Sequence, residues 1–154
     1  MAFVPDASTI DNLSHGWKTA LDFLDEPICL LDLDDRVVQA NKTFFARLGR
    51  QPEEVIGEPI SRFFHPEGEE VPCPVCQARY EQRDAVITLE ADDPRNHAGC
   101  SIQVRIGVIR DAEGNPSGIV QHIQDLSLIR EAENKYLDTC LLYTSDAADE
   151  EDSV

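Results

Sequence analysis

Two alternating apolar segments joined by a turn constrain the fold of this chain more than any other feature. The first, SIQVRIGVI at residues 101–109, has isoleucine or valine at every second position. Residues 111–118 (DAEGNPSG) are rich in turn-forming residues, and the second segment, GIVQHIQDL, covers 118–126. Because successive side chains of a strand point to opposite faces, this pattern predicts a β-hairpin with one buried face. The chain should therefore build an antiparallel sheet and cover one side of it.

The rest of the sequence predicts short strands and helices around this hairpin. In chain order we expect a helix at 8–24, strands at 28–33 and 36–40, short helices at 42–49 and 52–57, a short apolar turn at 59–64, a helix at 73–83 and a strand at 85–91. Asn41 is a preferred helix-capping residue, and Gly49 suits the left-handed conformation that ends many helices. This order predicts an α+β fold in which helices cover one face of an antiparallel sheet.

The sequence changes period after residue 126. Positions 129, 132, 136 and 139 lie three or four residues apart, which is the spacing of a coiled-coil seam. We therefore expect an N-terminal cap helix at 1–24, the domain itself at 25–126 and the start of a coiled-coil helix at 127–139. From Cys140 the string CLLYTSDAADE resembles a translated sequencing adapter, so residues 140–154 are expected to be a non-native tail.

Composition excludes several functional classes. The chain has 154 residues, of which 42% are hydrophobic, enough for one domain with its own core. Its formal net charge of −17 would repel phosphates, so we expect no nucleic-acid partner. The N-terminus lacks a signal-peptide pattern, and no apolar run approaches the roughly 20 residues that span a bilayer. We therefore expect no membrane segment in this chain and a cytoplasmic location, where its cysteines stay reduced.

Four cysteine and histidine residues are spaced as in a zinc site. Cys73 and Cys76 are separated by two residues, and so are His97 and Cys100. Two close pairs of soft or borderline ligands are how tetrahedral zinc sites are commonly assembled. A helix that starts at Cys73, followed by a returning strand, would bring the two pairs together. We therefore expect Cys73, Cys76, His97 and Cys100 to bind a metal ion, with His65 as a spare ligand.

Two other interpretations of Cys73 and Cys76 stay open. A Cys-Pro-x-Cys at a helix N-terminus is typical of redox-active dithiols, because the helix dipole lowers the pKa of the first thiol. The βαβ context of thioredoxin-like enzymes is missing, which favours a redox switch over a redox enzyme. Alternatively, both cysteines are packing residues of the helix, and His97 is an ordinary loop residue. We expect no catalytic residues in this chain.

The sequence from Leu21 to Tyr136 resembles the PAS family. In ICLLDLDDRVVQANKTFFARLGRQPEEVIGEPISRFFHP, an apolar strand, an acidic turn, a strand ending in Asn, a short helix ending in Gly and the string PEEVIG follow in the family's order. VRIGVIRDAEGNPSGIVQHIQDLSLIREAE resembles the last PAS hairpin and its connecting helix. The resemblance implies a five-stranded antiparallel sheet over a small cavity. Four aromatic residues are expected to line this cavity or the core, namely Phe44, Phe45, Phe63 and Phe64.

The resemblance also implies a function. PAS domains sense a ligand, cofactor, redox state or partner and pass the signal to an output domain. We therefore expect a bacterial, non-catalytic input domain that forms a homodimer through its terminal helices. Its missing output domain would be a histidine kinase or a diguanylate cyclase. The alternatives are a ligand-free interaction module of a transcription regulator and a thiol redox protein that uses Cys73 and Cys76.

Motifs of the best-defined PAS cofactor classes are absent from the sequence. The string Gly-x-Asn-Cys-Arg-Phe-Leu-Gln, typical of flavin photoreceptors with a reactive cysteine, does not occur. Gln77 follows Cys76 at the position where a c-type haem motif requires histidine. The cofactor therefore stays open between zinc, non-covalent haem and non-covalent flavin.

Overall fold

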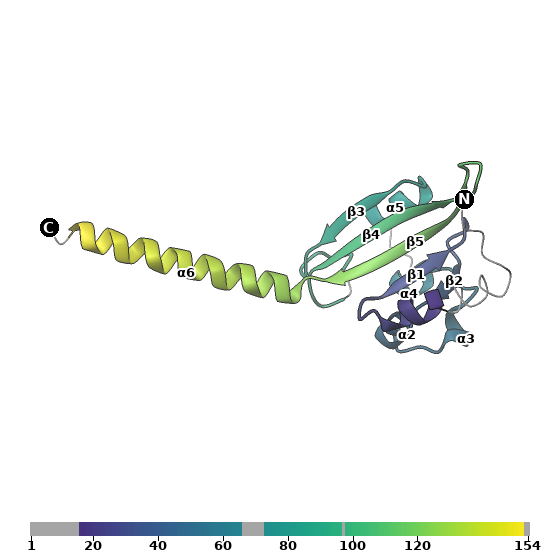
Figure 1. Ribbon diagram of the computed structural model, residues 1–154, viewed down its shortest axis with the longest axis horizontal. Coiled ribbons are helices and arrows are strands. Elements are labelled where there is room, and N and C mark those ends of the chain that lie inside the picture. Colours follow the sequence, from purple (N-terminus) through teal and green to yellow (C-terminus); the bar gives the residue numbers. More distant parts are fainter. Residues whose placement is uncertain (1–15, 66–72, 97, 153–154) are drawn as a thin grey trace, which may run out of the picture.

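A five-stranded antiparallel sheet organises the molecule (Figure 1). The computed structural model describes residues 16–65, 73–96 and 98–152, with the backbone alone for residues 140–152. The strands are β1 (Ile28–Leu31), β2 (Val37–Ala40), β3 (Ala85–Leu89), β4 (Ile102–Arg110) and β5 (Pro116–Asp125). Their order across the sheet is β2-β1-β5-β4-β3, and neighbouring strands are antiparallel throughout. The predicted α+β fold with its five-stranded sheet is confirmed.

The β4–β5 hairpin lies at the centre of this sheet, with β3 beyond β4 at one edge. On β4, Ile102, Val104 and Ile106 are buried, while Arg105 between the last two is exposed. The apolar positions that alternate in the sequence are therefore the positions on the buried face of the strand. Strand β5 also pairs with β1, which makes β5 the central strand. It is also the strand that leads directly into the C-terminal helix.

Short helices close the core against the sheet. They are α2 (Lys42–Leu48), α3 (Pro52–Val55), α4 (Ser61–Phe64) and α5 (Pro74–Tyr80), and all of them lie between β2 and β3 in the sequence. Phe44 of α2, Val55 of α3 and Val75 of α5 belong to one buried cluster that also contains the inward-facing residues of β1, β4 and β5. The core therefore lies between these helices and one face of the sheet.

The ends of the helices follow local chemistry. The Asn41 side chain accepts a hydrogen bond from the Phe44 backbone N–H at 3.0 Å, and Gly49 has a left-handed φ of 66°. Both roles were predicted. Helix α3 ends at Val55, short of the predicted boundary at 57, because Ile56 already has an extended backbone with ψ of 128°.

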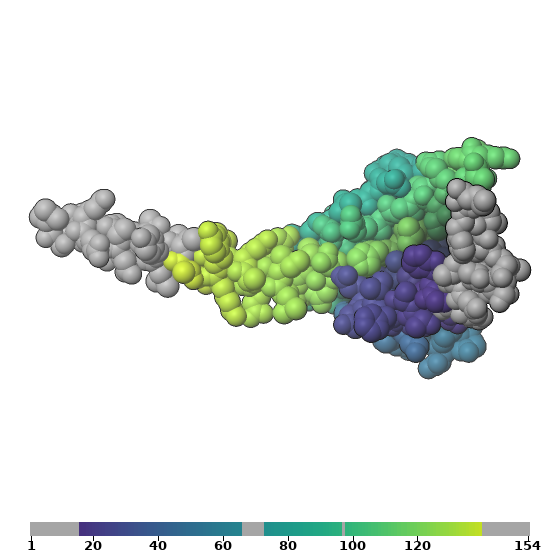
Figure 2. Space-filling model, in the orientation of Figure 1, coloured from purple at the N-terminus to yellow at the C-terminus, as the bar shows by residue number. Residues whose placement is uncertain are grey.

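Two helical segments flank the domain. Residues 16–23 are helical, and the part of the predicted cap helix before residue 16 lies outside the described residues. Helix α6 (Ser127–Asp152) extends away from the sheet, and its described side chains project beyond the rest of the domain (Figures 1 and 2). It runs through both the expected coiled-coil start and the expected non-native tail, and those two assignments stay predictions. In the part of the chain that the structure describes, no helix has the length and apolar character needed to cross a bilayer.

Candidate functional site

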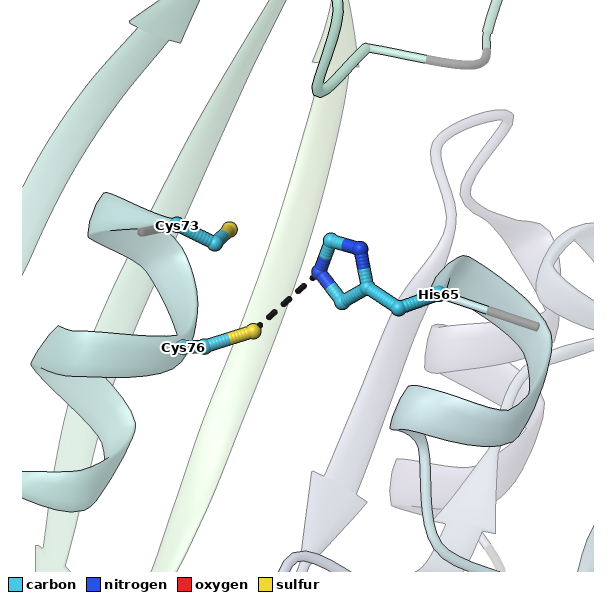
Figure 3. A group of neighbouring side chains, drawn as sticks. All are labelled: His65, Cys73 and Cys76. Atoms are coloured by element: carbon cyan, nitrogen blue, oxygen red, sulfur yellow. Dashed lines mark hydrogen bonds between the residues drawn. The ribbon is translucent and has the colours of Figure 1, made fainter. Parts of the chain in front are cut away.

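Three side chains with metal-binding atoms converge between α4 and α5. Cys73 is the N-cap of α5, Cys76 lies in its first turn, and His65 is the C-cap of α4. Their ligand atoms all lie within 4.8 Å of one another, and Cys76 Sγ is 3.2 Å from His65 Nε2. Figure 3 shows both cysteine side chains directed toward the imidazole ring. The cluster therefore joins the end of one helix to the start of the next.

The local sequence explains how the two cysteines come to the same side of α5. Pro74 occupies the first turn of α5, where its missing N–H leaves no helical hydrogen bond unmade. The Gln77 backbone N–H donates to the Cys73 carbonyl at 2.9 Å and closes that turn. Residues three apart in a helix share a face, so Cys73 and Cys76 present their sulfur atoms together.

The two thiols differ strongly in acidity. A hydrogen bond from the Cys76 thiol, together with backbone N–H groups of Cys76 and Val75 and the His65 side chain, lowers the pKa of Cys73 to about 4. The pKa of Cys76 is raised, first because its proton is held in the bond to Cys73 and then because of burial. At neutral pH the metal-free pair therefore carries one negative charge and one shared proton. A thiolate is the form of cysteine that binds a metal ion and that reacts with an oxidant, so the pair is suited to either chemistry.

A buried arginine lies behind the cysteines. Arg79 is 5% exposed, and its Nη2 donates to Cys76 Sγ at 3.3 Å. Its Nη1 donates to Gln121 Oε1 at 2.7 Å, and its Nε lies 3.4 Å from Asp35 Oδ1. Arg79 thus connects the cysteine pair to the central strand β5. This role was not predicted, because no sequence pattern distinguishes Arg79 in α5 from the exposed Arg83 just beyond it.

The cluster forms part of the wall of a cavity of about 410 Å³. His65, Cys73 and Cys76 all line it, as do apolar side chains from α2, α4 and the sheet. Phe44, Phe63 and Phe64 are among these lining residues, in agreement with the sequence-based expectation. Phe45 packs against the core and against Phe44, with the ring centroids 5.8 Å apart.

The predicted four-ligand set is only partly brought together. Cys73 and Cys76 are adjacent, and His65, predicted as a spare ligand, completes the group. Cys100 is described but does not belong to this group. Instead, its thiol forms a hydrogen bond with the Asp125 carboxylate, one of the smaller causes that lower the pKa of Asp125. His97 lies outside the described residues, although its neighbours Asn96 and Ala98 both line the cavity.

Comparison with known proteins defines the class. A family model described as the PAS fold matches residues 17–126, and the chain belongs to the PAS family. PAS domains are regulatory and sensory, so the chain contains a sensory module of the kind found in signalling proteins. No curated protein matches the sequence significantly.

Solved PAS structures share the fold at low sequence identity. The PAS domain of an HTR-like protein from Haloarcula marismortui is 17% identical, with a TM-score of 0.54 over 77% of this chain and 95% of that one. The PAS domain of BvgS from Bordetella pertussis is also 17% identical, with a TM-score of 0.54 over 86% and 99%. A sensory box sensor histidine kinase from Vibrio cholerae is 14% identical, with a TM-score of 0.53 over 77% and 95%.

Proposed function

We propose that this PAS domain is the input unit of a bacterial signalling protein and that it detects its signal at a metal ion held by His65, Cys73 and Cys76. The observation that carries the proposal is the convergence of these three side chains on the wall of one cavity. With bonds of about 2.3 Å to sulfur and about 2.0 Å to nitrogen, a tetrahedral zinc ion fits ligand atoms separated by a few ångströms. The 4.8 Å limit on their separations is compatible with such an ion.

The chemistry of the donor set also suits zinc. Two thiolates and a neutral imidazole balance the charge of a divalent ion, and thiolate sulfur favours zinc over magnesium or calcium. The ion would displace the proton that Cys76 shares with Cys73. Arg79 Nη2 would remain beside the Cys76 sulfur and hold its orientation, as outer partners of metal ligands commonly do. His97 remains a predicted further ligand, because its chain neighbours line the same cavity.

A loop provides a route from the site to α6. Residues 90–101 connect β3 to β4 and include Arg95, Asn96 and Ala98, which line the cavity. At the other end of this loop, the Leu126 backbone N–H donates to the Ser101 carbonyl at 2.8 Å. Arg130 Nη2 of α6 also donates to Glu90 Oε1 at 2.6 Å. A change at the cavity that moved this loop would therefore move the first turn of α6.

The proposal includes the partners that the family resemblance implied. Helix α6 exposes Leu128, Ile129, Tyr136 and Leu137, and Trp17 is exposed on the N-terminal helical segment. These side chains are available for a homodimer built on the terminal helices, with a histidine kinase or diguanylate cyclase following α6. The domain itself is proposed to be non-catalytic. The predicted cytoplasmic location, which keeps thiols reduced, belongs to the same proposal.

Elemental mass spectrometry of protein purified without a histidine tag tests the metal site. About one zinc ion per chain is expected in the wild type, and none in Cys73→Ser/Cys76→Ser. His65→Ala should bind zinc more weakly, because it removes one of three ligands. His122→Ala is the matched control, since His122 lies on β5 and contacts Glu26 at 3.3 Å outside the cluster. A metal-free wild type, or full zinc content in the double serine variant, would rule the site out.

The acidity of Cys73 favours a second candidate function, a thiol switch without metal. In that case Cys73 and Cys76 would form a reversible disulfide when a peroxide oxidises the pair. Each disulfide would consume one equivalent of peroxide and release water. Mass spectrometry of the metal-free protein after peroxide treatment would show the loss of two hydrogen atoms between these residues. If neither metal nor disulfide is found, the ligand-free interaction module remains.

A further inference from the structure

The cavity is lined by a buried polar side chain that lies on the sheet, outside the cysteine and histidine cluster. Gln121 belongs to the central strand β5, is 3% exposed and lines the cavity. Its Oε1 accepts the hydrogen bond from Arg79 Nη1 at 2.7 Å. Because a guanidinium group can only donate, this bond fixes the orientation of the amide and leaves the Nε2 donor for another partner.

The Nε2 donor of Gln121 is open to the cavity. Among the described residues no acceptor pairs with Nε2, and this atom is not one of their fully enclosed side-chain atoms that lack a partner. Nε2 therefore keeps accessible surface. Since Gln121 is buried in the protein and lines the cavity, that surface faces the cavity. A donor without an acceptor in a buried site costs free energy, and a ligand that accepts from it would remove this cost.

We propose that the cavity binds a small neutral aromatic molecule whose carbonyl oxygen accepts a hydrogen bond from Gln121 Nε2. This inference concerns an organic ligand and does not require the metal ion of the proposed function. Binding is non-covalent, so no covalent bond changes and no proton or electron is transferred.

The size and lining of the cavity suit an aromatic ring with a short substituent. Its volume of about 410 Å³ exceeds the approximately 150 Å³ of an engineered apolar cavity that binds benzene. Phe44 of α2 and Phe63 and Phe64 of α4 line it. The rings of Phe44 and Phe64 already make a tilted contact, with their centroids 6.5 Å apart. A third aromatic ring would gain contacts of the same kind together with the burial of its apolar surface.

The charged groups around the cavity favour a neutral ligand over an ion. Arg79 and Arg95 both line the cavity, but Arg79 Nε lies 3.4 Å from Asp35 Oδ1 and Arg95 Nη2 lies 2.7 Å from Asp93 Oδ2. Neither guanidinium group is therefore left over for a ligand carboxylate. An ammonium group would be repelled by Arg79, which contacts Gln121 directly. The uncharged Nε2 donor is matched by an uncharged acceptor such as a carbonyl oxygen.

Titrations with acetophenone and α-methylstyrene test the inference on the wild-type protein. The two molecules have nearly the same shape, but only acetophenone has a carbonyl oxygen. Chemical-shift changes in nitrogen-15 NMR spectra report binding, and the side-chain NH₂ signals of Gln121 are assigned through bonds to its backbone. We expect saturable binding of acetophenone, and larger shifts of these NH₂ signals with acetophenone than with α-methylstyrene. Absence of saturable acetophenone binding, or equal shifts with both molecules, would overturn the inference.

Gln121→Glu removes the donor and keeps the bond that fixes α5 to the sheet. One carboxylate oxygen still accepts from Arg79, while the other replaces Nε2 and repels a carbonyl oxygen. The ratio of the acetophenone affinity to the α-methylstyrene affinity should therefore fall by about tenfold or more relative to the wild type. An unchanged ratio in folded Gln121→Glu would overturn the role assigned to Gln121.

Gln124→Glu is the matched control, because it adds the same charge to the same strand. Gln124 pairs with Gln103 across the β4–β5 ladder and is not among the residues that line the cavity. Its ratio of affinities should equal that of the wild type, and a fall as large as that in Gln121→Glu would overturn the inference. Zinc content is measured on the same samples. Acetophenone binding to a zinc-free protein would contradict only the metal site, and a zinc protein that does not bind acetophenone would contradict only the present inference.

Discussion

Arg79 of α5 donates a hydrogen bond of 2.7 Å to the Gln121 side chain on β5, and both residues are buried. The bond joins residues 42 positions apart in the sequence, and the same guanidinium group contacts Cys76. A helix that presents two thiols to the cavity is thereby fixed to the central strand of the sheet. Because β5 continues into α6, Arg79 also connects Cys76 to the strand that leads into the C-terminal helix.

Replacing Arg79 should destabilise the metal-free protein. In Arg79→Ala the Gln121 carbonyl oxygen loses its donor in a buried position, and Asp35 loses its nearby cation. Buried polar groups left without partners lower the free energy of unfolding by about 3 kcal/mol. Urea denaturation followed by circular dichroism measures the difference. Arg83→Ala, whose side chain pairs with Glu81 at the surface, should change the midpoint little; equal midpoints for both variants would contradict the assigned role.

Asn41 should be a second sensitive position. Its side chain accepts from the backbone N–H groups of Phe44 and Ile28 and donates to the carbonyls of Leu21 and Glu26. One amide thus caps α2 and ties the N-terminal segment to β1. Asn41→Ala removes all four bonds at a site that is 1% exposed. We expect a loss of about 3 kcal/mol from the lost cap and the unpaired groups.

The variant Asn41→Asp tests which half of the amide matters. Aspartate keeps the acceptor oxygen for Phe44 but brings a negative charge toward the carbonyls of Leu21 and Glu26. Its stability should be no better than that of Asn41→Ala at neutral pH and should recover partly when acid protonates the carboxyl group. The exposed turn residue Asn115, replaced by alanine, serves as the control. Full stability of Asn41→Asp at neutral pH would show that the donor bonds contribute little.

The sheet and the helix caps were predictable because their signals are local. Ile102, Val104 and Ile106 alternate in the sequence as they alternate in burial, and Asn41 caps the helix that immediately follows it. Periodicity and capping depend on neighbours within a few residues. Such features need no knowledge of how the elements pack.

The candidate site was harder to predict from the sequence because it depends on packing between elements. The spacing of Cys73 and Cys76 indicated a pair, but the meeting of that pair with His65 depends on where α4 ends relative to α5. The third and fourth ligands were inferred from the spacing of a second pair, His97 and Cys100, but spacing does not say toward which element a side chain points. Cys100 lies outside the group, and His97 stays a prediction. Arg79 was missed for the same reason, since its burial follows from Gln121 on a distant strand.

The contact between Glu90 and Arg130 should hold the first turn of α6 against the loop at residues 90–101. Arg130 donates to Glu90 at 2.6 Å, and the Ser101 hydroxyl donates to the other Glu90 oxygen at 2.8 Å. In Arg130→Ala, backbone amides of residues 127–131 should exchange with deuterium several-fold faster. Local unfolding of the first turn costs less free energy when it does not have to break this contact. Lys135→Ala removes a surface pair with Glu131 farther along α6 and should leave those amides unchanged. Identical exchange in the two variants would show that this contact does not restrain α6.

The low pKa of Cys73 predicts how its reactivity depends on pH in the metal-free protein. A thiol whose folded-state pKa is about 4 is already a thiolate at pH 5, so its alkylation rate should be nearly flat between about pH 5 and 8. In the urea-unfolded chain, where the pKa returns to about 8.5, the rate should rise about tenfold per pH unit over that range. Iodoacetamide labelling followed by peptide mass spectrometry measures both profiles.

Two further cysteine positions make this labelling experiment decisive. Cys29 is 1% exposed and burial raises its pKa to about 12, so it should remain unlabelled in the folded protein. Cys76→Ala removes the thiol proton that contributes most to the low pKa of Cys73, so the flat region should move to higher pH. The sign is fixed by the cause, because losing a donor to a thiolate always raises the pKa of that thiol. A folded wild type whose Cys73 profile follows that of the unfolded chain would show that Cys73 is protonated at neutral pH, and the thiol-switch candidate would lose its support.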